Sequence, residues 1–386
     1  MYCNQPSIQN EESVKMLPCY GTTYIRHANG LYLAIEDNGI CLSQKGFLWR
    51  VEVYEDDRFY LGDFSGHDKF EYWYGKFQIT VDTGYTEQHW RLYKKGRHIL
   101  IQHADSNLFL FHSAEENLTM KEKIHEDEGF CFFLEEPSLT DGYPYLEIHS
   151  TTDKIAIRFE PTILRVVNGE WLIEMANDLE KAMFSYARLV GFMPFPKIEI
   201  RAYANCDPWA HIFFGKPVVH INNEVFEKEI VRLRKRKVKG VPFVFLHEIS
   251  HLYDKASWLF DVEAIANFKL AYVLYELGYN ASLDVHSENQ AFTYENYIEL
   301  LREEHGTLDN VKSLFCSALT AKFVEIAKAV GWEPFFQVFR NFPDVQQLPA
   351  FGRFETFISK VSEYANADVR SMFSSEEWHS VERTLS

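Results

Sequence analysis

The chain has 386 residues, and its 39 Lys and Arg stand against 56 Asp and Glu, a formal net charge of −17 at pH 7. An acidic chain is poorly suited to neutralise phosphates, so we exclude general nucleic-acid binding. No apolar run reaches the roughly 20 residues of a membrane-spanning helix, and at roughly 100–200 residues per domain the length favours two domains.

The first part of the chain, residues 1–20, is polar, and we expect a loose arm there. It lacks a basic segment followed by an apolar one, so no secretory signal is visible. The 6 cysteines are scattered and form no Cys-x-x-Cys pair, which is typical of free thiols in a reducing compartment. We therefore expect a cytoplasmic chain, or one exported by a non-classical route.

Residues 21–137 consist of short aromatic and β-branched runs separated by turn-forming residues, a pattern that predicts many short strands. A motif recurs at a spacing of roughly 40 residues. Ile25–Leu33 resembles Ile101–Leu110, and Tyr60–Phe70 is a degenerate middle copy. Each copy ends in an aromatic-centred strand, and the central aromatic residues are Trp49, Trp90 and Phe132.

Three all-β copies of this length resemble a β-trefoil of the ricin-B-like lectin type. The Gln-x-Trp signature of that fold is intact only at Gln88–Trp90. We expect the three central aromatic residues to fill the core rather than to stack on sugars. The resemblance implies glycan binding as a further role, and the polar turns Asp37–Asn38 and Asp105–Asn107 are its candidates.

Residues 138–386 predict a second domain of the α+β class. A hairpin is expected over 145–159, a helix over 170–190, and strands over 197–203 and 217–221. Beyond residue 240 the apolar spacing is mostly helical. The expected fold is therefore an all-β trefoil followed by an α+β domain with a helical C-terminal half.

One motif in this domain carries chemistry: residues 247–251 read His-Glu-Ile-Ser-His. On a helix, His247 and His251 lie one turn apart on the same face and can bind one Zn²⁺. Glu248 can then take a proton from a water at the metal. The apolar lead-in 241–246 predicts that the other faces of this helix are buried.

A zinc peptidase needs a third protein ligand, and two acidic residues are available, Asp261 and Glu263. Glu263 opens a new helical run that extends to Leu274, and a carboxylate in the first turn suits the helix dipole. We choose Glu263, because Asp261 would more naturally cap that helix.

The segment resembles the enhancin-like and mucin-degrading metallopeptidases, peptidase family M-sixty. The matching residues are the His-Glu-Ile-Ser-His motif, Trp258, Glu263 and Asn267, with weaker patches at 214–218, 330–336 and 357–373. The resemblance implies a gluzincin-type zincin fold and a zinc endopeptidase that cleaves glycoproteins or mucin-like proteins. It also implies His247, His251 and Glu263 as the zinc ligands and Glu248 as the general base.

We expect the protein substrate to lie along an edge strand at Pro217–Ile221, in contact with Gly215, Pro217 and Val218. The sequence does not identify the group that stabilises the oxyanion; Tyr294, Tyr297 and His286 are candidates. We expect a monomer.

Two alternative functions are a regulatory or binding protein built on a peptidase-like scaffold, and a lectin with an inert helical domain. The intact zinc motif favours the enzyme, because a scaffold has no physical need for Glu248.

Overall fold

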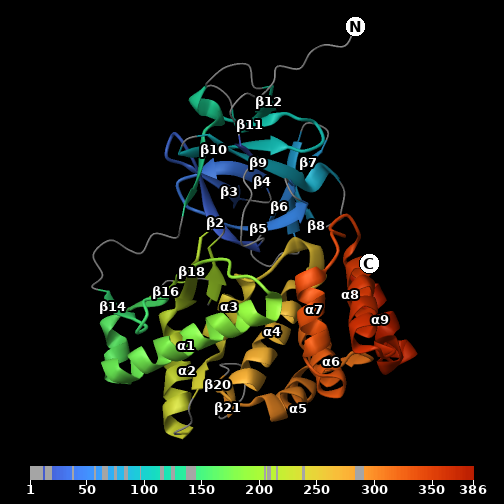
Figure 1. Ribbon diagram of the computed structural model, residues 1–386. Helices are drawn as coiled ribbons and strands as arrows, with labels where there is room; N and C mark the ends of the chain where they lie inside the picture. Colours follow the sequence, from blue (N-terminus) through green and yellow to red (C-terminus); the bar gives the residue numbers. More distant parts are fainter. Residues whose placement is uncertain are drawn as a thin grey trace. The chain divides into compact units, whose positions relative to one another are not determined.

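A computed structural model describes residues 12–13, 20–36, 39–55, 58–62, 68–73, 76–81, 86–95, 97–113, 117–122, 127–135, 145–203, 206, 210–213, 216–236, 240–282 and 291–386. The chain forms two compact units, residues 1–138 and 139–386, and each is described by itself (Figure 1). The polar arm expected over 1–20 lies outside the described residues, except for positions 12, 13 and 20.

The first unit is all β. After β1 (Glu12–Ser13), its strands fall into three consecutive groups. The first group is β2 (Tyr20–His27), β3 (Tyr32–Glu36), β4 (Gly39–Ser43) and β5 (Leu48–Glu55). The second is β6 (Arg58–Gly62), β7 (Asp68–Trp73), β8 (Lys76–Val81) and β9 (His89–Lys95). The third is β10 (His98–His103), β11 (Phe109–Phe111), β12 (Thr119–Lys121) and β13 (Phe132–Glu135).

Strand pairing closes these groups into a barrel. The first and last strands of each group pair in the order β2-β5-β6-β9-β10-β13, and β13 pairs again with β2. The middle strands form the hairpins β3–β4, β7–β8 and β11–β12, and each hairpin is joined to the first strand of its group. This threefold pairing is the strand arrangement of a β-trefoil.

The aromatic residues that end each repeat fill the barrel core, as predicted: Trp49, Trp90 and Phe132 are all 0% exposed. Trp49 Nε1 donates to the Leu33 carbonyl at 2.8 Å, and Trp90 Nε1 donates to the Phe70 carbonyl at 2.8 Å. Both bonds run from the last strand of a group to its second strand. They satisfy an indole N–H that would otherwise be buried without a partner. Phe132 has no such donor.

The second unit contains a mixed sheet and a set of helices. Its main sheet has the order β14 (Leu146–His149), β15 (Ile155–Phe159), β16 (Ile198–Tyr203), β18 (Val218–Asn222) and β17 (Ala210–Ile212). β15, β16 and β18 are parallel, while β17 runs antiparallel to β18. The described residues also form small strands: β19 (Gly240–Pro242), β20 (Asn280–Ser282), β21 (Ala291–Phe292), β22 (Gly306–Thr307) and β23 (Asn310–Val311).

The expectation that Pro217–Ile221 forms an edge strand is wrong. β18 lies between β16 and β17, so β17 is the terminal strand of the described sheet on that side. β17 spans only Ala210–Ile212, a run too short to stand out as a strand by its alternation. It forms a hairpin with β18 in which the Phe213 N–H donates to the Val218 carbonyl at 2.8 Å.

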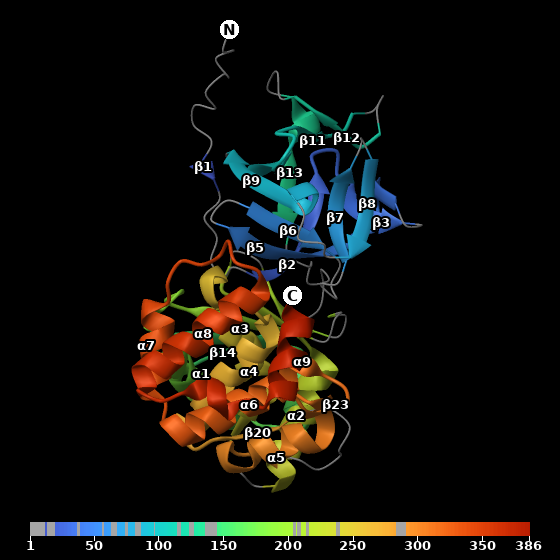
Figure 2. The same ribbon diagram turned by 90° about the vertical axis from the view of Figure 1, so that its right-hand side faces the viewer.

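The helices are α1 (Gly169–Val190), α2 (Asn223–Arg236), α3 (Phe243–His251), α4 (Val262–Leu277), α5 (Tyr294–His305), α6 (Phe315–Val330), α7 (Glu333–Asn341), α8 (Ala350–Ala365) and α9 (Ser375–Leu385). α4 contacts α1, α3, α5 and α6, and it is the central helix of this half (Figure 2). Burial on all its sides agrees with its nearly continuous apolar sequence. None of the described helices is both long enough and apolar enough to cross a bilayer.

The trefoil core gives a first prediction. We expect Trp90→Ala to destabilise the first unit by about 3–5 kcal/mol, because it opens a large cavity and leaves the Phe70 carbonyl without its donor. Urea unfolding of the full chain would measure this change. Lys94→Ala, at an exposed site on the same strand, is the control and should stay within about 0.5 kcal/mol. Equal losses in the two variants would contradict the core assignment.

Candidate metal centre

Contacts from α2 and α1 hold the first half of α3, the helix that carries the His-Glu-Ile-Ser-His motif. The fully buried carboxylate of Glu229, on α2, accepts the Val244 N–H at 3.3 Å. A carboxylate in this place also suits the positive end of the helix dipole. From α1, the Tyr186 hydroxyl donates to the Leu246 carbonyl at 2.8 Å. These contacts position α3 before any ligand is considered.

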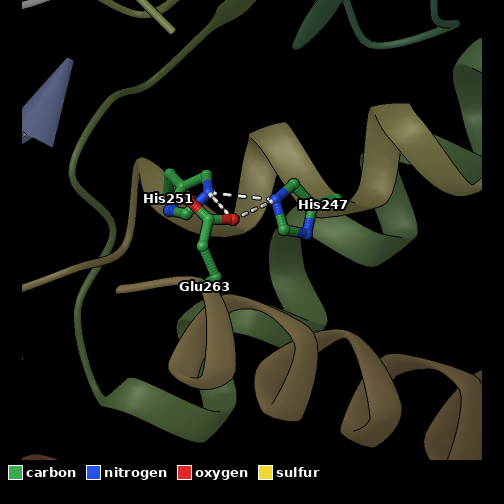
Figure 3. A group of neighbouring side chains, drawn as sticks. All are labelled: His247, His251 and Glu263. Atoms are coloured by element: carbon green, nitrogen blue, oxygen red, sulfur yellow. Dashed lines mark hydrogen bonds and ion pairs between the residues drawn. The ribbon is translucent and has the colours of Figure 1, made fainter. Parts of the chain in front are cut away.

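Three side chains converge at the end of α3. His247 Nε2 lies 2.9 Å from Glu263 Oε2 and 3.1 Å from His251 Nε2. His251 Nε2 lies 3.7 Å from the same Glu263 oxygen. Figure 3 shows the two imidazoles projecting from α3 toward the carboxylate, which rises from α4. Within the described part of the chain, this is the group whose donor atoms, all within 4.8 Å of one another, could hold a metal ion.

Glu263 joins the group because of where α4 begins. Asp261 is the N-cap of α4, and its carboxylate accepts the Ala264 N–H at 2.8 Å. Capping occupies Asp261 and leaves Glu263, in the first turn, to face the imidazoles. The structure therefore brings Glu263 rather than Asp261 to the two histidines.

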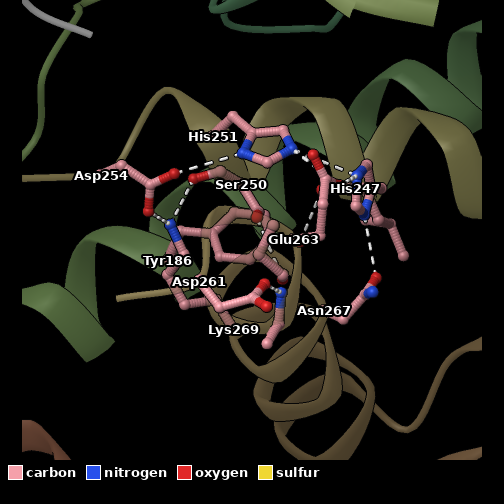
Figure 4. A network of polar contacts seen from close by, with 12 residues as sticks. Tyr186, His247, Ser250, His251, Asp254, Asp261, Glu263, Asn267 and Lys269 are labelled. Carbon is pink, nitrogen blue, oxygen red and sulfur yellow. Dashed lines mark hydrogen bonds and ion pairs between the residues drawn. The ribbon is translucent and has the colours of Figure 1, made fainter. Parts of the chain in front are cut away.

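The far sides of both imidazoles are also bound. His247 Nδ1 lies 2.9 Å from Asn267 Oδ1, and His251 Nδ1 lies 3.2 Å from Asp254 Oδ2 (Figure 4). Both partners are acceptors, so each Nδ1 donates a proton outward and each Nε2 faces the group, where it would bind a metal once free of its own proton. Sequence reasoning missed Asp254 and its partner Lys269. The one available signal was a lone charge, Lys269, in an apolar helical run.

Burial and charge shift the acidities of this group. Burial raises the pKa of Glu248, against the effect of the two neighbouring imidazoles. Burial alone would lower the pKa of His251, but Glu263 and Asp254 outweigh it and raise the pKa to about 10. Burial alone would raise the pKa of Glu263, but the imidazoles of His251 and His247 hold it well below its usual range.

The donor set fits Zn²⁺. Two imidazole nitrogens and one carboxylate oxygen are ligands that catalytic zinc sites use, with a further position open. The His251 side chain is 2% exposed and the His247 side chain 12%, whereas Glu263 is 40% exposed. The group is therefore enclosed on the histidine side and accessible on the glutamate side.

The other predicted residues that the structure describes do not belong to the group of His247, His251 and Glu263. Pro217 is half-buried and Val218 is buried at the start of β18, while Gly215 lies outside the described residues. Of the oxyanion candidates, Tyr294 packs against Tyr275 and Trp332. Tyr297 is 1% exposed in the helical core, and His286 lies outside the described residues.

No protein-family model matches the chain, and a search of curated proteins finds none similar to it. Among solved structures, a Polyporus squamosus lectin bound to a human-type influenza-binding epitope has 17% identity and a TM-score of 0.27, covering 30% of this chain and 48% of the lectin. The designed three-fold symmetric protein ThreeFoil has 14% identity and a TM-score of 0.27, covering 30% of this chain and 99% of ThreeFoil.

A third structure, an endo-β-galactosidase from Clostridium perfringens that releases GlcNAcα1-4Gal, has 14% identity and a TM-score of 0.28, covering 31% of this chain and 33% of the enzyme. The chain thus spans less than half the length of the lectin and of the galactosidase. Similarities this slight carry no argument, so the trefoil assignment rests on the strand pairing. The resemblance to enhancin-like peptidases stays a prediction.

The electrostatics of the centre predict that zinc affinity and the stability of the metal-free protein change in opposite directions with pH. Zinc must displace the proton that His251 holds, so zinc affinity should fall by about tenfold per pH unit as the pH decreases from roughly 8 to roughly 6. The raised pKa of His251 stabilises the metal-free fold fully below its unfolded pKa of roughly 6.5. This contribution is lost as the pH rises toward about 10.

Chelator competition at several pH values would measure the zinc affinity, and thermal unfolding of the metal-free chain would measure the second effect. An affinity that does not change over this pH range would show that zinc displaces no proton from the centre.

Proposed function

We propose that residues 139–386 form a zinc-dependent endopeptidase. The observation that carries the proposal is the convergence of His247, His251 and Glu263 from two packed helices, with Glu248 beside them on α3. The two histidines and Glu263 would hold the metal. Zn²⁺, when bound, would polarise the scissile carbonyl and acidify a water.

Glu248 has the properties of a general base in this arrangement. It follows His247 directly and is only 7% exposed, and burial raises its pKa. A carboxylate with a raised pKa can take the proton of the attacking water and then give it to the leaving amine. The second step requires that Glu248 release this proton again, and the neighbouring imidazoles favour its release because they lower the pKa of Glu248.

Because β17 rather than β18 is the strand at the end of the described sheet, we place the substrate along β17. An extended peptide would pair with β17, whose outer side is the end of the described sheet. Pro217 and Val218 lie where the β17–β18 hairpin enters β18, so they remain candidates for contact with a substrate along that edge. The substrate class, glycoproteins or mucin-like proteins, is what the family resemblance implies.

Zinc analysis and proteolysis together test the function. We expect about one zinc per chain, lost in His251→Ala and Glu263→Ala. Glu248→Gln should keep its zinc but lose at least about 100-fold in cleavage rate, because the amide cannot accept the proton. Glu299→Gln, an exposed site on α5, is the matched control and should cleave normally.

Two results would contradict the enzyme. A reconstituted chain without zinc would exclude the metal centre. Zinc without cleavage of glycosylated and bare protein substrates would instead favour a regulatory protein built on a peptidase-like scaffold.

A second candidate function, glycan binding, belongs to the first unit. The turn after β10 presents Asp105, Ser106 and Asn107 to solvent. Asn107 adopts φ 58°, and its side-chain oxygen accepts from Arg91 Nη1 at 3.3 Å. This places an acid and an amide on one exposed turn, beside the guanidinium of Arg91 on β9, a set of groups that can bind sugar hydroxyls. The other candidate turn, Asp37–Asn38, lies outside the described residues.

Glycan binding by the full chain tests this second function. We expect Asp105→Ala to weaken binding to an immobilised glycoprotein glycan by at least about tenfold, since one charged hydrogen bond is lost. Glu128→Gln, an exposed acid elsewhere in the same unit, should bind normally. Glu248→Gln should also bind normally, which separates this function from peptidase activity. Absence of binding in the unmodified chain would leave the trefoil without this role.

A further inference from the structure

A buried ion pair lies behind the metal centre. The side chains of Asp254 and Lys269 are both 0% exposed, and Lys269 Nζ donates to Asp254 Oδ1. The same ammonium donates to the Ser250 carbonyl at 2.6 Å. The other oxygen of Asp254 accepts from His251 Nδ1 (Figure 4). A chain of polar contacts thus runs from α4, through Asp254, to one of the proposed zinc ligands.

Stability alone does not explain this pair. Removing two charges from water is unfavourable, and apolar residues of similar size often replace a buried ion pair without loss of stability. Lys269 also occupies an otherwise apolar part of α4, between Phe268 and Leu270, which are both 0% exposed. An apolar side chain at this position would continue the packing of its neighbours. The lysine therefore needs another explanation.

The two histidines are oriented in different ways. His247 donates to a neutral amide, Asn267, which lies on α4. His251 donates to a carboxylate in the segment between α3 and α4. That carboxylate has no helix to fix its position, and its second oxygen is bound by Lys269. The orientation of His251 therefore depends on Lys269, acting through Asp254.

We propose that Lys269 is a positioning residue of the metal centre. It fixes Asp254, and through Asp254 it fixes the ring plane and the Nδ1–H tautomer of His251, so that Nε2 faces the centre before a metal binds. The inference rests on the proposed zinc site and names a residue that is not itself one of the proposed ligands.

The test is a double-mutant cycle in the full chain, with zinc affinity measured by chelator competition. Lys269→Met and Asp254→Asn should each weaken zinc binding by about 10–100-fold, the range typical of partners that orient metal ligands. The double variant should bind zinc more tightly than the product of the two losses predicts. Its introduced amide can still accept the Nδ1–H, and it leaves neither charge buried alone.

Two further measurements separate positioning from general stability. The absorption spectrum of the Co²⁺-loaded chain reports ligand geometry, and it should change in Lys269→Met. The control is Lys322→Met, because Lys322 is also buried and its Nζ lies 2.9 Å from Glu377 in an ion pair between α6 and α9. This control should lower the unfolding temperature but leave zinc affinity and the Co²⁺ spectrum unchanged.

The possible results are distinct. If the unmodified chain binds no zinc, the proposed function fails and this inference fails with it. If it binds zinc, then unchanged affinity and spectrum in Lys269→Met, or strictly additive losses in the cycle, overturn the inference alone. Should Lys269→Met not fold, the double variant decides: the inference requires it to fold and to bind zinc more tightly than Asp254→Asn.

Discussion

The close contact between α3 and α4 is the interaction on which the second unit depends. Ser250, which is fully buried, donates from its hydroxyl to the Ala266 carbonyl at 3.0 Å. Its own carbonyl accepts from Lys269. Two backbone carbonyls, one from each helix, are thus satisfied across the interface, and a small side chain allows the helices to approach. This approach brings Glu263 to the two histidines, although they lie on different helices.

The local parts of this arrangement could be predicted from the sequence. The spacing of His247 and His251 places them on one face of a single helix. The choice of Glu263 over Asp261 follows because Asp261 is in the position that caps the next helix. The repeats of the first unit could also be predicted, because alternating strands and recurring aromatic residues are local patterns. Trp49 and Trp90 occupy equivalent places in successive groups and make equivalent hydrogen bonds.

The remaining features depend on packing, and the sequence does not show them. In the sequence Asp254 is an ordinary acidic residue between two helices. Only the packing of α4 shows that it pairs with Lys269. β17 is a short segment, and only its pairing with β18 shows that it is the strand at the end of the sheet. The tyrosines considered for the oxyanion occupy helical positions that a spacing argument cannot distinguish from core positions, and the structure buries both.

The concentration of function on α4 has a consequence for dynamics. A single helix supplies the acidic donor Glu263, the amide of Asn267 and the ammonium of Lys269, and its residues from Ala264 to Leu274 are all buried. Metal occupancy and the docking of α4 are therefore thermodynamically linked, because the contacts that Glu263, Asn267 and Lys269 make at the centre also hold the helix. Amide hydrogen exchange in α4 therefore reports metal occupancy: exchange slows when the metal binds and becomes faster when a chelator removes it.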